Sequence, residues 1–330
     1  MATTPEMRQF VDDVVPRGGS EDSRIDALIY ALRHPGIKRI EYDAGANYNA
    51  AEVFRTRRAN CLSFAALFIS LAREAGFRAR FQSVEAGAQW ERLDNDLLLR
   101  LQHVNTLVSG AGNKEHIIEF QRDRFNLMMT RKPVTDAFGI GLYYNNVGGD
   151  YLFRGELDTA RAYLSHALTS DPRLAAAWVN LGVTHRRQGR PDLAEISYRQ
   201  ALEVDRRSTV AMNNLATLLE RRGESEIATV LRDRAFKARL KNPNYHFALA
   251  RHAYDEQNYQ AALGHLDEAL RRDGRAHNFH HLMALTLHAL GEAEEARASL
   301  RRAARKATND QDRDSYRATL AAWDASPHGT

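Results

Sequence analysis

The chain of 330 residues has very little cysteine: Cys61 is its one such residue. A single cysteine excludes an internal disulfide, so the fold must be stable without one. The sequence also lacks an apolar run long enough for a signal peptide or a membrane-spanning helix. We therefore expect a cytoplasmic protein without a membrane span, or a periplasmic one if a signal segment has been removed.

A strong charge excess is also absent. Lysine and arginine number 46 and aspartate and glutamate 42, and the two signs are interspersed along the chain. Recognition of nucleic acid needs basic residues clustered on one face, so we expect no nucleic-acid partner. The length suits two domains, or one domain followed by a repeat array.

The one cysteine lies at the predicted start of a helix. Asn60 is a favourable N-cap residue, and Gly76 is a suitable terminator after a helix of residues 61–75. Backbone N–H groups and the helix dipole in the first turn favour a thiolate over a thiol. The competing interpretation is that Cys61 is a small buried hydrophobe. The apolar residues at helical spacing are Leu62, Ala65, Ala66, Ile69 and Ala72.

A β-hairpin is predicted further along, with strands at 97–108 and 115–120 around a glycine-containing turn. If the turn is centred near Ala111, opposed residue numbers sum to about 222, and His103 then faces Glu119. Opposed residues share one face, with Cβ atoms roughly 5 Å apart. His103 and Glu119 should therefore form a hydrogen bond. The other opposed pairs are Asn105 with Ile117 and Leu107 with Glu115.

These residues suit nucleophilic catalysis. A thiol nucleophile needs a base beside it and a third polar group that orients the imidazole. In isolation, His103 is better explained as a core histidine and Glu119 as a strand-edge charge. The conjunction of these two residues with Cys61 at a helix start favours a triad. A zinc site with His116 is disfavoured, because His116 falls on the other face of the hairpin and the ligand spacing is absent. We expect no metal and no cofactor. For Trp90 we expect either a place in the wall of an acyl pocket or a packing role.

The Asn60-Cys61-Leu62-Ser63-Phe64 sequence, with a helix ending in Leu-Ala-Arg-Glu-Ala-Gly, resembles the transglutaminase-like cysteine superfamily over roughly residues 20–125. The resemblance implies a papain/transglutaminase-like α+β domain, assigned to residues 1–130, with a triad of Cys61, His103 and an acid. The family usually has Asp at the third position, where this chain has Glu119, and Asp123 is a substitute candidate.

The second half of the chain repeats with a period of 34 residues from position 141. Small residues recur at the eighth, twentieth and twenty-seventh positions of each unit, where two helix backbones would approach closely. This pattern resembles the tetratricopeptide repeat, which has two antiparallel helices per unit. The resemblance implies an all-α solenoid of five units: 141–174, 175–208, 209–242, 243–276 and 277–310.

Departures from the repeat are few. Arg232 occupies a usually apolar position, Gln257 replaces the turn glycine, and only Pro172 fills the unit-ending proline position. Residues 131–140 are assigned to a connector, and 311–330 to a capping helix and tail. Because the connector is short, we expect the array to pack against the N-terminal domain.

The first helices of stacked repeats line a concave face, which here mixes basic and aromatic residues. We expect it to bind a protein or peptide, with acidic character or a free carboxylate. Two functions follow: a cysteine hydrolase or acyltransferase whose repeats recruit its substrate, or an adaptor with a catalytically silent N-terminal domain. The predicted ligand-binding residues are Asn145, Arg186, Arg187, Asn213, Arg221, Phe247, Arg251, Tyr254 and His281.

Overall fold

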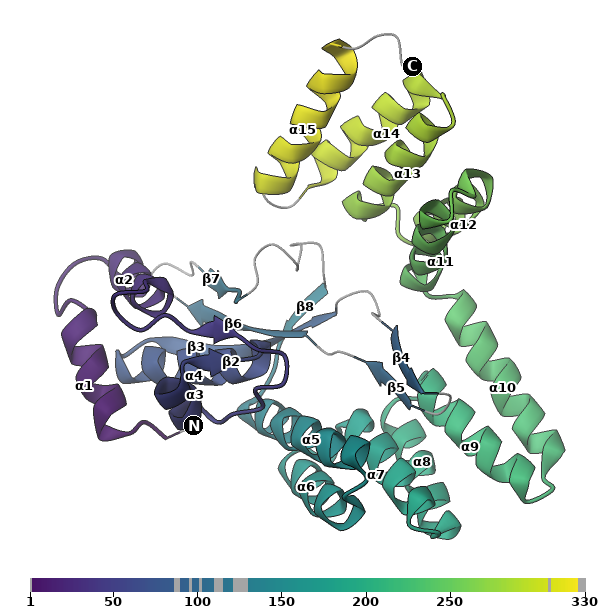
Figure 1. Ribbon diagram of the computed structural model, residues 1–330, viewed down its shortest axis with the longest axis horizontal. Helices are drawn as coiled ribbons and strands as arrows, with labels where there is room; N and C mark the ends of the chain where they lie inside the picture. Colours follow the sequence, from purple (N-terminus) through teal and green to yellow (C-terminus); the bar gives the residue numbers. More distant parts are fainter. Residues whose placement is uncertain are drawn as a thin grey trace. The chain divides into compact units, whose positions relative to one another are not determined.

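The computed structural model describes residues 2–85, 90–94, 97–100, 103–109, 115–120, 130–307 and 310–325. These residues form two compact units, and the chain passes from the first to the second after Leu231 (Figure 1). The side chain of Trp90 and all of Asp123, both considered from the sequence, lie outside the described residues. None of the described helices is long and apolar enough to cross a membrane.

Four helices begin the first unit, and each starts at a side chain that caps it. Thr4, Ser20, Asn49 and Asn60 each accept a hydrogen bond from a backbone N–H of the first turn. These N–H groups have no partner within the helix, so capping fixes where each helix begins. The helices are α1 (Pro5–Val14), α2 (Glu21–Arg33), α3 (Ala50–Thr56) and α4 (Cys61–Glu74).

The main sheet has four strands in the order β7-β6-β3-β8, all antiparallel to their neighbours. Two further pairs of strands form small sheets, β1 with β2 and β4 with β5. The strands are β1 (Glu41–Tyr42), β2 (Arg58–Ala59), β3 (Arg78–Glu85), β4 (Trp90–Asp94), β5 (Leu97–Arg100), β6 (His103–Ser109), β7 (Glu115–Ile118) and β8 (Thr130–Pro133).

Helix α4 is the central element of the N-terminal core. It packs against β3 and β6, and most of its side chains are buried. Phe68 and Ile69 on α4 and Phe81 on β3 belong to one hydrophobic cluster. Burial of such side chains stabilises the fold by about 1.5–3 kcal/mol each. The sequence therefore fixes the start of α4, and with it the position of Cys61, by both capping and packing.

The hairpin register differs from the sequence-based prediction. Leu107 pairs with Ile117 and Ser109 with Glu115, so opposed residue numbers sum to 224 rather than 222. The predicted strand 97–108 is also divided, because Leu97–Arg100 pairs with β4 while β6 begins at His103. The glycine-containing turn does not specify one loop length, so the register was not determined by the turn. A shift of two residues keeps every side chain on its predicted face.

The predicted connector at 131–140 contains regular structure. Residues 130–133 form β8, which pairs with β3 at the edge of the sheet, and α5 begins at Asp136. Pro133 ends this strand, which is a position where a sheet tolerates proline. The charged, proline-containing sequence was typical of a linker, so the edge strand was missed.

Each predicted repeat unit contains two helices, and α15 follows the last of them. The second unit starts at Ala175, and the fourth and fifth start at Pro243 and His277. The helices are α5 (Asp136–Arg154), α6 (Leu157–Ser170), α7 (Ala175–Arg187), α8 (Pro191–Val204), α9 (Thr209–Arg221), α10 (Ser225–Leu240), α11 (Pro243–Asp255), α12 (Tyr259–Arg272), α13 (His277–Ala289), α14 (Ala293–Lys306) and α15 (Asp310–Ala325). The change of compact unit falls at Arg232, the residue that departs from the apolar pattern.

The small repeat residues are buried where paired helices meet. Ala194 and Ala262 have no exposed surface. A Cβ atom on Gly182 would lie 2.4 Å from the Tyr198 ring, so the α7–α8 approach excludes even a methyl group. The turn positions have positive φ, and Gln257 adopts a φ of 60° where the other units use glycine.

Replacing Ala194 or Ala262 with leucine should lower the free energy of unfolding by about 1–3 kcal/mol, because the extra atoms overpack a close helix pair. Thermal unfolding measures the change. Ala322→Leu, at an exposed position of α15, is the matched control and should leave the melting temperature nearly unchanged. Equal melting temperatures for all three variants and the parent would contradict the repeat alignment.

The first repeats share a core with the N-terminal domain within unit 1. Leu142, Ala167 and Leu174 belong to the same hydrophobic cluster as Phe64 and Phe81. The Arg73 guanidinium binds both carboxylate oxygens of Asp136, at 2.6 and 2.9 Å. Asn47 donates to Asp150 at 2.6 Å. The expected packing of the array on this domain therefore holds for α5 to α7.

Burial of Tyr143 marks the same junction. Its ring packs against the N-terminal core and meets the Tyr144 ring edge-on at 5.4 Å. Burial, followed by the charge of Glu52, raises the pKa of Tyr143 to about 12. The neutral phenol thus contributes to a mixed apolar and polar junction.

The second unit ends in a packed histidine cluster. His277 has no exposed surface, and its Nδ1 lies 2.7 Å from the Tyr316 hydroxyl of α15. The ring of His281 lies 4.7 Å from that of Tyr316. Burial lowers the pKa of His277 to about 4 and also lowers the pKa of His281, while Asp312 opposes both shifts.

Acid should therefore weaken this unit. Below the ordinary histidine pKa the unfolded chain binds more protons than the folded one, so stability falls as the pH drops from about 6.5 towards 4. We expect a loss of about 2–3 kcal/mol over this window from His277. His277→Gln should flatten the dependence of the melting temperature on pH, while His252→Gln, at an exposed site, should not. If the melting temperature of both variants depends on pH as steeply as that of the parent, His277 is not the group that causes the loss of stability in acid.

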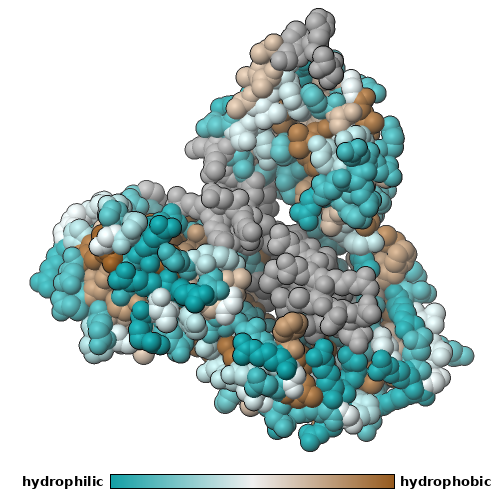
Figure 2. Space-filling view, in the orientation of Figure 1, coloured by the Kyte–Doolittle hydropathy of each residue, from teal (hydrophilic) through white to brown (hydrophobic). Residues whose placement is uncertain are grey.

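Figure 2 shows that hydrophilic residues cover much of the described surface of both units, with apolar patches between them. This distribution agrees with the interspersed charges of the sequence. The larger exposed apolar side chains include Phe153, Ile196, Ile227, Val230 and Phe236.

Candidate active site

The three residues predicted to form a triad lie together. One ligand-type atom from each of Cys61, His103 and Glu119 lies within 4.8 Å of the other two. His103 Nε2 donates a hydrogen bond to Glu119 Oε2 over 2.7 Å. His103 is 4% and Glu119 7% exposed, whereas Cys61 is half-buried. The thiol is thus the most accessible of the three groups.

A polar network holds Cys61 at the first residue of α4. Asn60 Oδ1 accepts from the backbone N–H of Ser63 at 2.9 Å, and Asn60 Nδ2 donates to Asn47 Oδ1 at 2.7 Å. The buried Ser63 hydroxyl donates to the carbonyl of Ala46. These bonds tie the turn that precedes α3 to the start of α4. The N–H groups of the first turn are thereby fixed around the cysteine.

The shifted register changes how the acid reaches the histidine. Continuing the ladder by one residue places Glu119 opposite Asn105, so Glu119 and His103 are diagonal rather than direct neighbours. Diagonal Cβ atoms lie farther apart than opposed ones. Glu has one methylene more than Asp, and this longer side chain spans the diagonal to form the 2.7 Å contact.

Asn105 is a site residue that the sequence analysis named only as a hairpin position. Its Nδ2 donates to Glu119 Oε2 at 3.3 Å, and it is 2% exposed. Arg33 donates a hydrogen bond to the backbone carbonyl of Glu119 at 2.8 Å, which fixes the backbone of Glu119. In the sequence, this role was indicated by the position of Asn105, a polar residue two positions after His103 and therefore on the same face of the strand.

His116 points to a different partner. Its Nε2 lies 2.8 Å from Asp22 Oδ1 on α2. This agrees with the prediction that His116 and His103 occupy opposite faces of the hairpin. His116 is therefore a useful control residue for experiments on His103.

The side chains of Cys61, His103 and Glu119 are also of the types that bind zinc. Ligands at about 2 Å from a tetrahedral zinc ion lie roughly 3.3 Å apart. The 2.7 Å contact between His103 and Glu119 is instead the length of a hydrogen bond. As arranged, the residues fit an oriented imidazole beside a thiol better than a metal site.

The predicted ligand-binding residues of the repeats divide into exposed and packed groups. Arg187, Arg221 and Arg251 are exposed, and Arg187 donates to the carbonyl of Leu152 at 3.1 Å. Arg186 and Asn213 are half-buried. The other four residues are packed against neighbours. Asn145 accepts a hydrogen bond from Asn180, and Phe247 stacks on Phe279. The ring of Tyr254 contacts that of Tyr259, and the ring of His281 contacts that of Tyr316.

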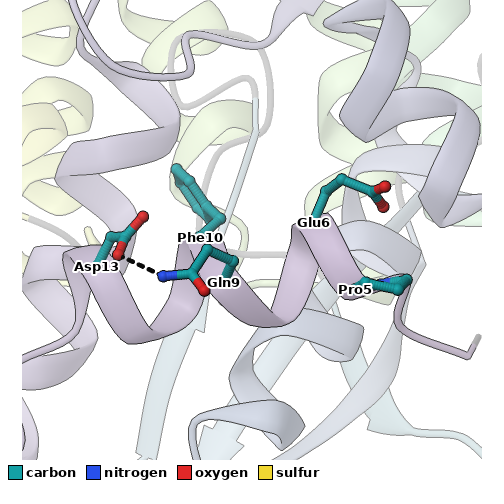
Figure 3. A pocket seen from close by; sticks show the side chains of 5 residues that line it. All are labelled: Pro5, Glu6, Gln9, Phe10 and Asp13. Atoms are coloured by element: carbon teal, nitrogen blue, oxygen red, sulfur yellow. Dashed lines mark hydrogen bonds between the residues drawn. The ribbon is translucent and has the colours of Figure 1, made fainter.

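A surface hollow of about 450 Å³ lies along α1 and involves none of the triad residues (Figure 3). Gln9 donates to Asp13 at 2.8 Å beside it. The Phe10 ring, which also lines the hollow, packs edge-on against Phe54 at 5.4 Å. These contacts stabilise α1 and bring no further reactive group to the site.

Family models match three parts of the chain. The transglutaminase-like superfamily model matches residues 8–117, and the tetratricopeptide repeat model matches 139–207. A model of anaphase-promoting complex (cyclosome) subunit 3 matches 223–303. No curated protein matched the chain in a sequence search.

Solved structures similar to this chain include a crystal structure of MamA, with 18% identity over 51% of this chain and 91% of that chain at a TM-score of 0.29. YrrB, described as a TPR protein with an unusual peptide-binding site, is 18% identical over 52% of this chain and 89% of its own chain, with a TM-score of 0.29. The pilF protein of Pseudomonas aeruginosa is 22% identical over 58% of this chain and 95% of its own chain, with a TM-score of 0.30. The chain consists of an N-terminal domain of the transglutaminase-like superfamily followed by tetratricopeptide repeats.

Proposed function

We propose that the N-terminal domain is a cysteine-dependent hydrolase or acyltransferase that acts on amide or ester bonds. The observation that carries this proposal is the grouping of Cys61, His103 and Glu119 within 4.8 Å at the start of α4. A thiol, an imidazole and a carboxylate in this order meet the requirements of nucleophilic acyl transfer.

In the first step, Cys61 Sγ attacks the substrate carbonyl carbon, and His103 takes the thiol proton. The resulting oxyanion accepts hydrogen bonds, including one from the backbone N–H of Cys61 in this proposal. The C–N or C–O bond then breaks, His103 gives its proton to the departing amine or alcohol, and a thioester remains on Cys61. Water or an amine then attacks the thioester and loses a proton to His103. The C–S bond breaks, a carboxylic acid or a new amide leaves, and His103 returns the proton to Cys61 Sγ.

Glu119 acts through His103. A carboxylate bound to Nε2–H directs Nδ1 towards the thiol and stabilises the imidazolium that forms in each step. Asn105 donates to the same Oε2 and limits the carboxylate to one orientation. These two contacts support the use of Glu at a position where related proteins usually have Asp.

Tetratricopeptide repeats imply interaction with another protein or a peptide. We propose that this partner is the substrate, or that it brings the substrate. The exposed Arg187, Arg221 and Arg251 favour an acidic segment or a free carboxylate. Since α5 to α7 share a core with the N-terminal domain, the first units would hold a bound partner beside the domain that carries Cys61.

A second candidate function is an adaptor whose N-terminal domain has no turnover. The near-complete burial of His103 and Glu119 favours it, because a silent domain would keep such residues as a packed polar pair. The two functions differ in one measurable property, which is the reaction of Cys61 with an acyl donor.

Burst kinetics with p-nitrophenyl acetate distinguish them. The proposed enzyme should release about one p-nitrophenol per chain in a fast phase, in a buffer with EDTA to remove metals, followed by slower turnover. Cys61→Ser should abolish the fast phase. A wild-type chain that reacts no faster than a simple thiol at the same pH would support the adaptor and contradict the hydrolase.

A further inference from the structure

The groove between α14 and α15 has an unusual charge distribution. A hollow of about 300 Å³ is lined there by four arginines, Arg301 and Arg305 on α14 and Arg313 and Arg317 on α15. The two helices lie side by side in the second unit and are joined through a cluster that includes Tyr316 (Figure 1).

Each helix contributes its two arginines at positions i and i+4, which lie next to each other on a helix surface. Like charges at this spacing repel each other and destabilise a helix. Folding therefore opposes this arrangement unless the charges are neutralised.

The two arginines of α15 have partners within the described chain, and the two on α14 are more exposed to an external partner. Arg317 lies 3.8 Å from Asp314, and Arg313 donates to the carbonyl of Ala307 at the end of α14. The neighbouring Arg297 pairs with Asp324. Within the described part of the second unit, no carboxylate lies at ion-pair distance from Arg301 or Arg305, and both are exposed.

The positive field reaches the interior of the unit. Burial lowers the pKa of His280, and the charges of Lys306, Arg302 and Arg305 lower it further. These residues lie along α14. The groove is therefore the end of a basic helix, and an anionic partner would be attracted to it.

The floor of the groove is apolar. Ala304 is buried, and the half-buried Leu320 packs against the same cluster; both line the hollow. Arginine guanidinium groups bind carboxylates in a bidentate manner. An apolar floor between two sets of such groups fits an apolar side chain flanked by carboxylates better than a free phosphate.

We propose that the α14–α15 groove is a second binding site for protein, which takes an acidic peptide segment with an apolar residue between its carboxylates. This site shares no residue with the predicted concave-face set that includes Arg187, Arg221 and Arg251. It does not depend on the reaction of Cys61, so its test does not involve catalysis.

The test uses the full chain and a fluorescein-labelled peptide with two acidic residues on each side of a leucine. Its control peptide has glutamine and asparagine in place of the acids. Fluorescence anisotropy gives the Kd at low and at physiological salt. We expect Arg301→Gln/Arg305→Gln to raise the Kd for the acidic peptide about tenfold. Arg206→Gln/Arg207→Gln changes the net charge equally at exposed positions and should raise it less than twofold.

Leu320→Asn should also weaken binding of the acidic peptide, which separates groove binding from attraction by charge alone. Equal losses in the two double arginine variants would overturn the proposal. The proposal would also be overturned if binding of the acidic peptide depended on Arg251 and not on Arg301 and Arg305. That outcome would leave the proposed function intact. A single-stranded oligonucleotide that binds more tightly through Arg301 and Arg305 would assign the groove to nucleic acid instead.

Discussion

Replacing His103 with glutamine should slow the p-nitrophenol burst by about 10²–10⁴-fold, the usual contribution of a positioned general base. Glutamine cannot take the thiol proton, so Cys61 then reacts as an ordinary thiol. Glu119→Gln should produce a smaller loss, because the imidazole remains but loses the carboxylate that orients it and stabilises its charge. Stopped-flow absorbance measures both rates.

His116→Gln is the matched control for this experiment. It removes an imidazole from the same hairpin, where His116 contacts Asp22 rather than the triad. Its burst rate should equal that of the parent. A His103→Gln variant that retains the parent burst rate, with an unchanged melting temperature, would contradict the role of His103 as base.

A large change in stability is also expected for Gly139→Ala at the start of α5. A Cβ atom there would lie 2.4 Å from the ring of Phe81, which is 1% exposed in the core of the N-terminal domain. Aromatic rings in a close-packed core cannot move aside without other shifts. We expect a loss of about 1–3 kcal/mol or more in the free energy of unfolding, measured by chemical denaturation.

Gly149→Ala on the same helix provides a control of opposite sign. No atom lies within 4 Å of a Cβ built there. Alanine is favoured over glycine inside a helix by about 0.8–1.0 kcal/mol, so this variant should be stabilised. If both variants change stability in the same direction, the close approach of α5 to β3 is wrong.

The close contact at Gly139 also affects how the two halves can be separated. A cut near Pro133 would remove β8 partly and all of α5, and it would expose the apolar surface that Leu142 and Leu174 cover. A fragment of residues 1–130 should therefore be unstable. Point variants of the full chain are therefore a better test of whether the repeats bind the substrate.

The sequence predicts much of this structure where the pattern has a direct physical cause. Asn60 caps α4, and the recurring alanines such as Ala194 and Ala262 determine where helices meet. These features depend on neighbours in the chain or on a strict period. The association of Cys61 with His103 and Glu119 was also predicted, because strand alternation fixes which side chains share a face.

Other features depend on contacts that no local pattern specifies. The register of β6 with β7 depends on a loop length that its glycine-containing turn leaves open. The role of β8 and the burial of Gly139 against Phe81 depend on packing between distant parts of the chain. The contact of Asn105 with Glu119 follows from the register, so it too required the structure.

The central claim is that Cys61 is an acyl-accepting nucleophile activated by His103. Intact-protein mass spectrometry after rapid mixing with p-nitrophenyl acetate and acid quenching tests it most directly. The account predicts one acetyl group per chain, located on Cys61 by peptide mapping, which forms in the wild-type chain and in His116→Gln but only slowly in His103→Gln. An acetyl group that forms at the same slow rate in all three chains, or that resides on other residues, would contradict it.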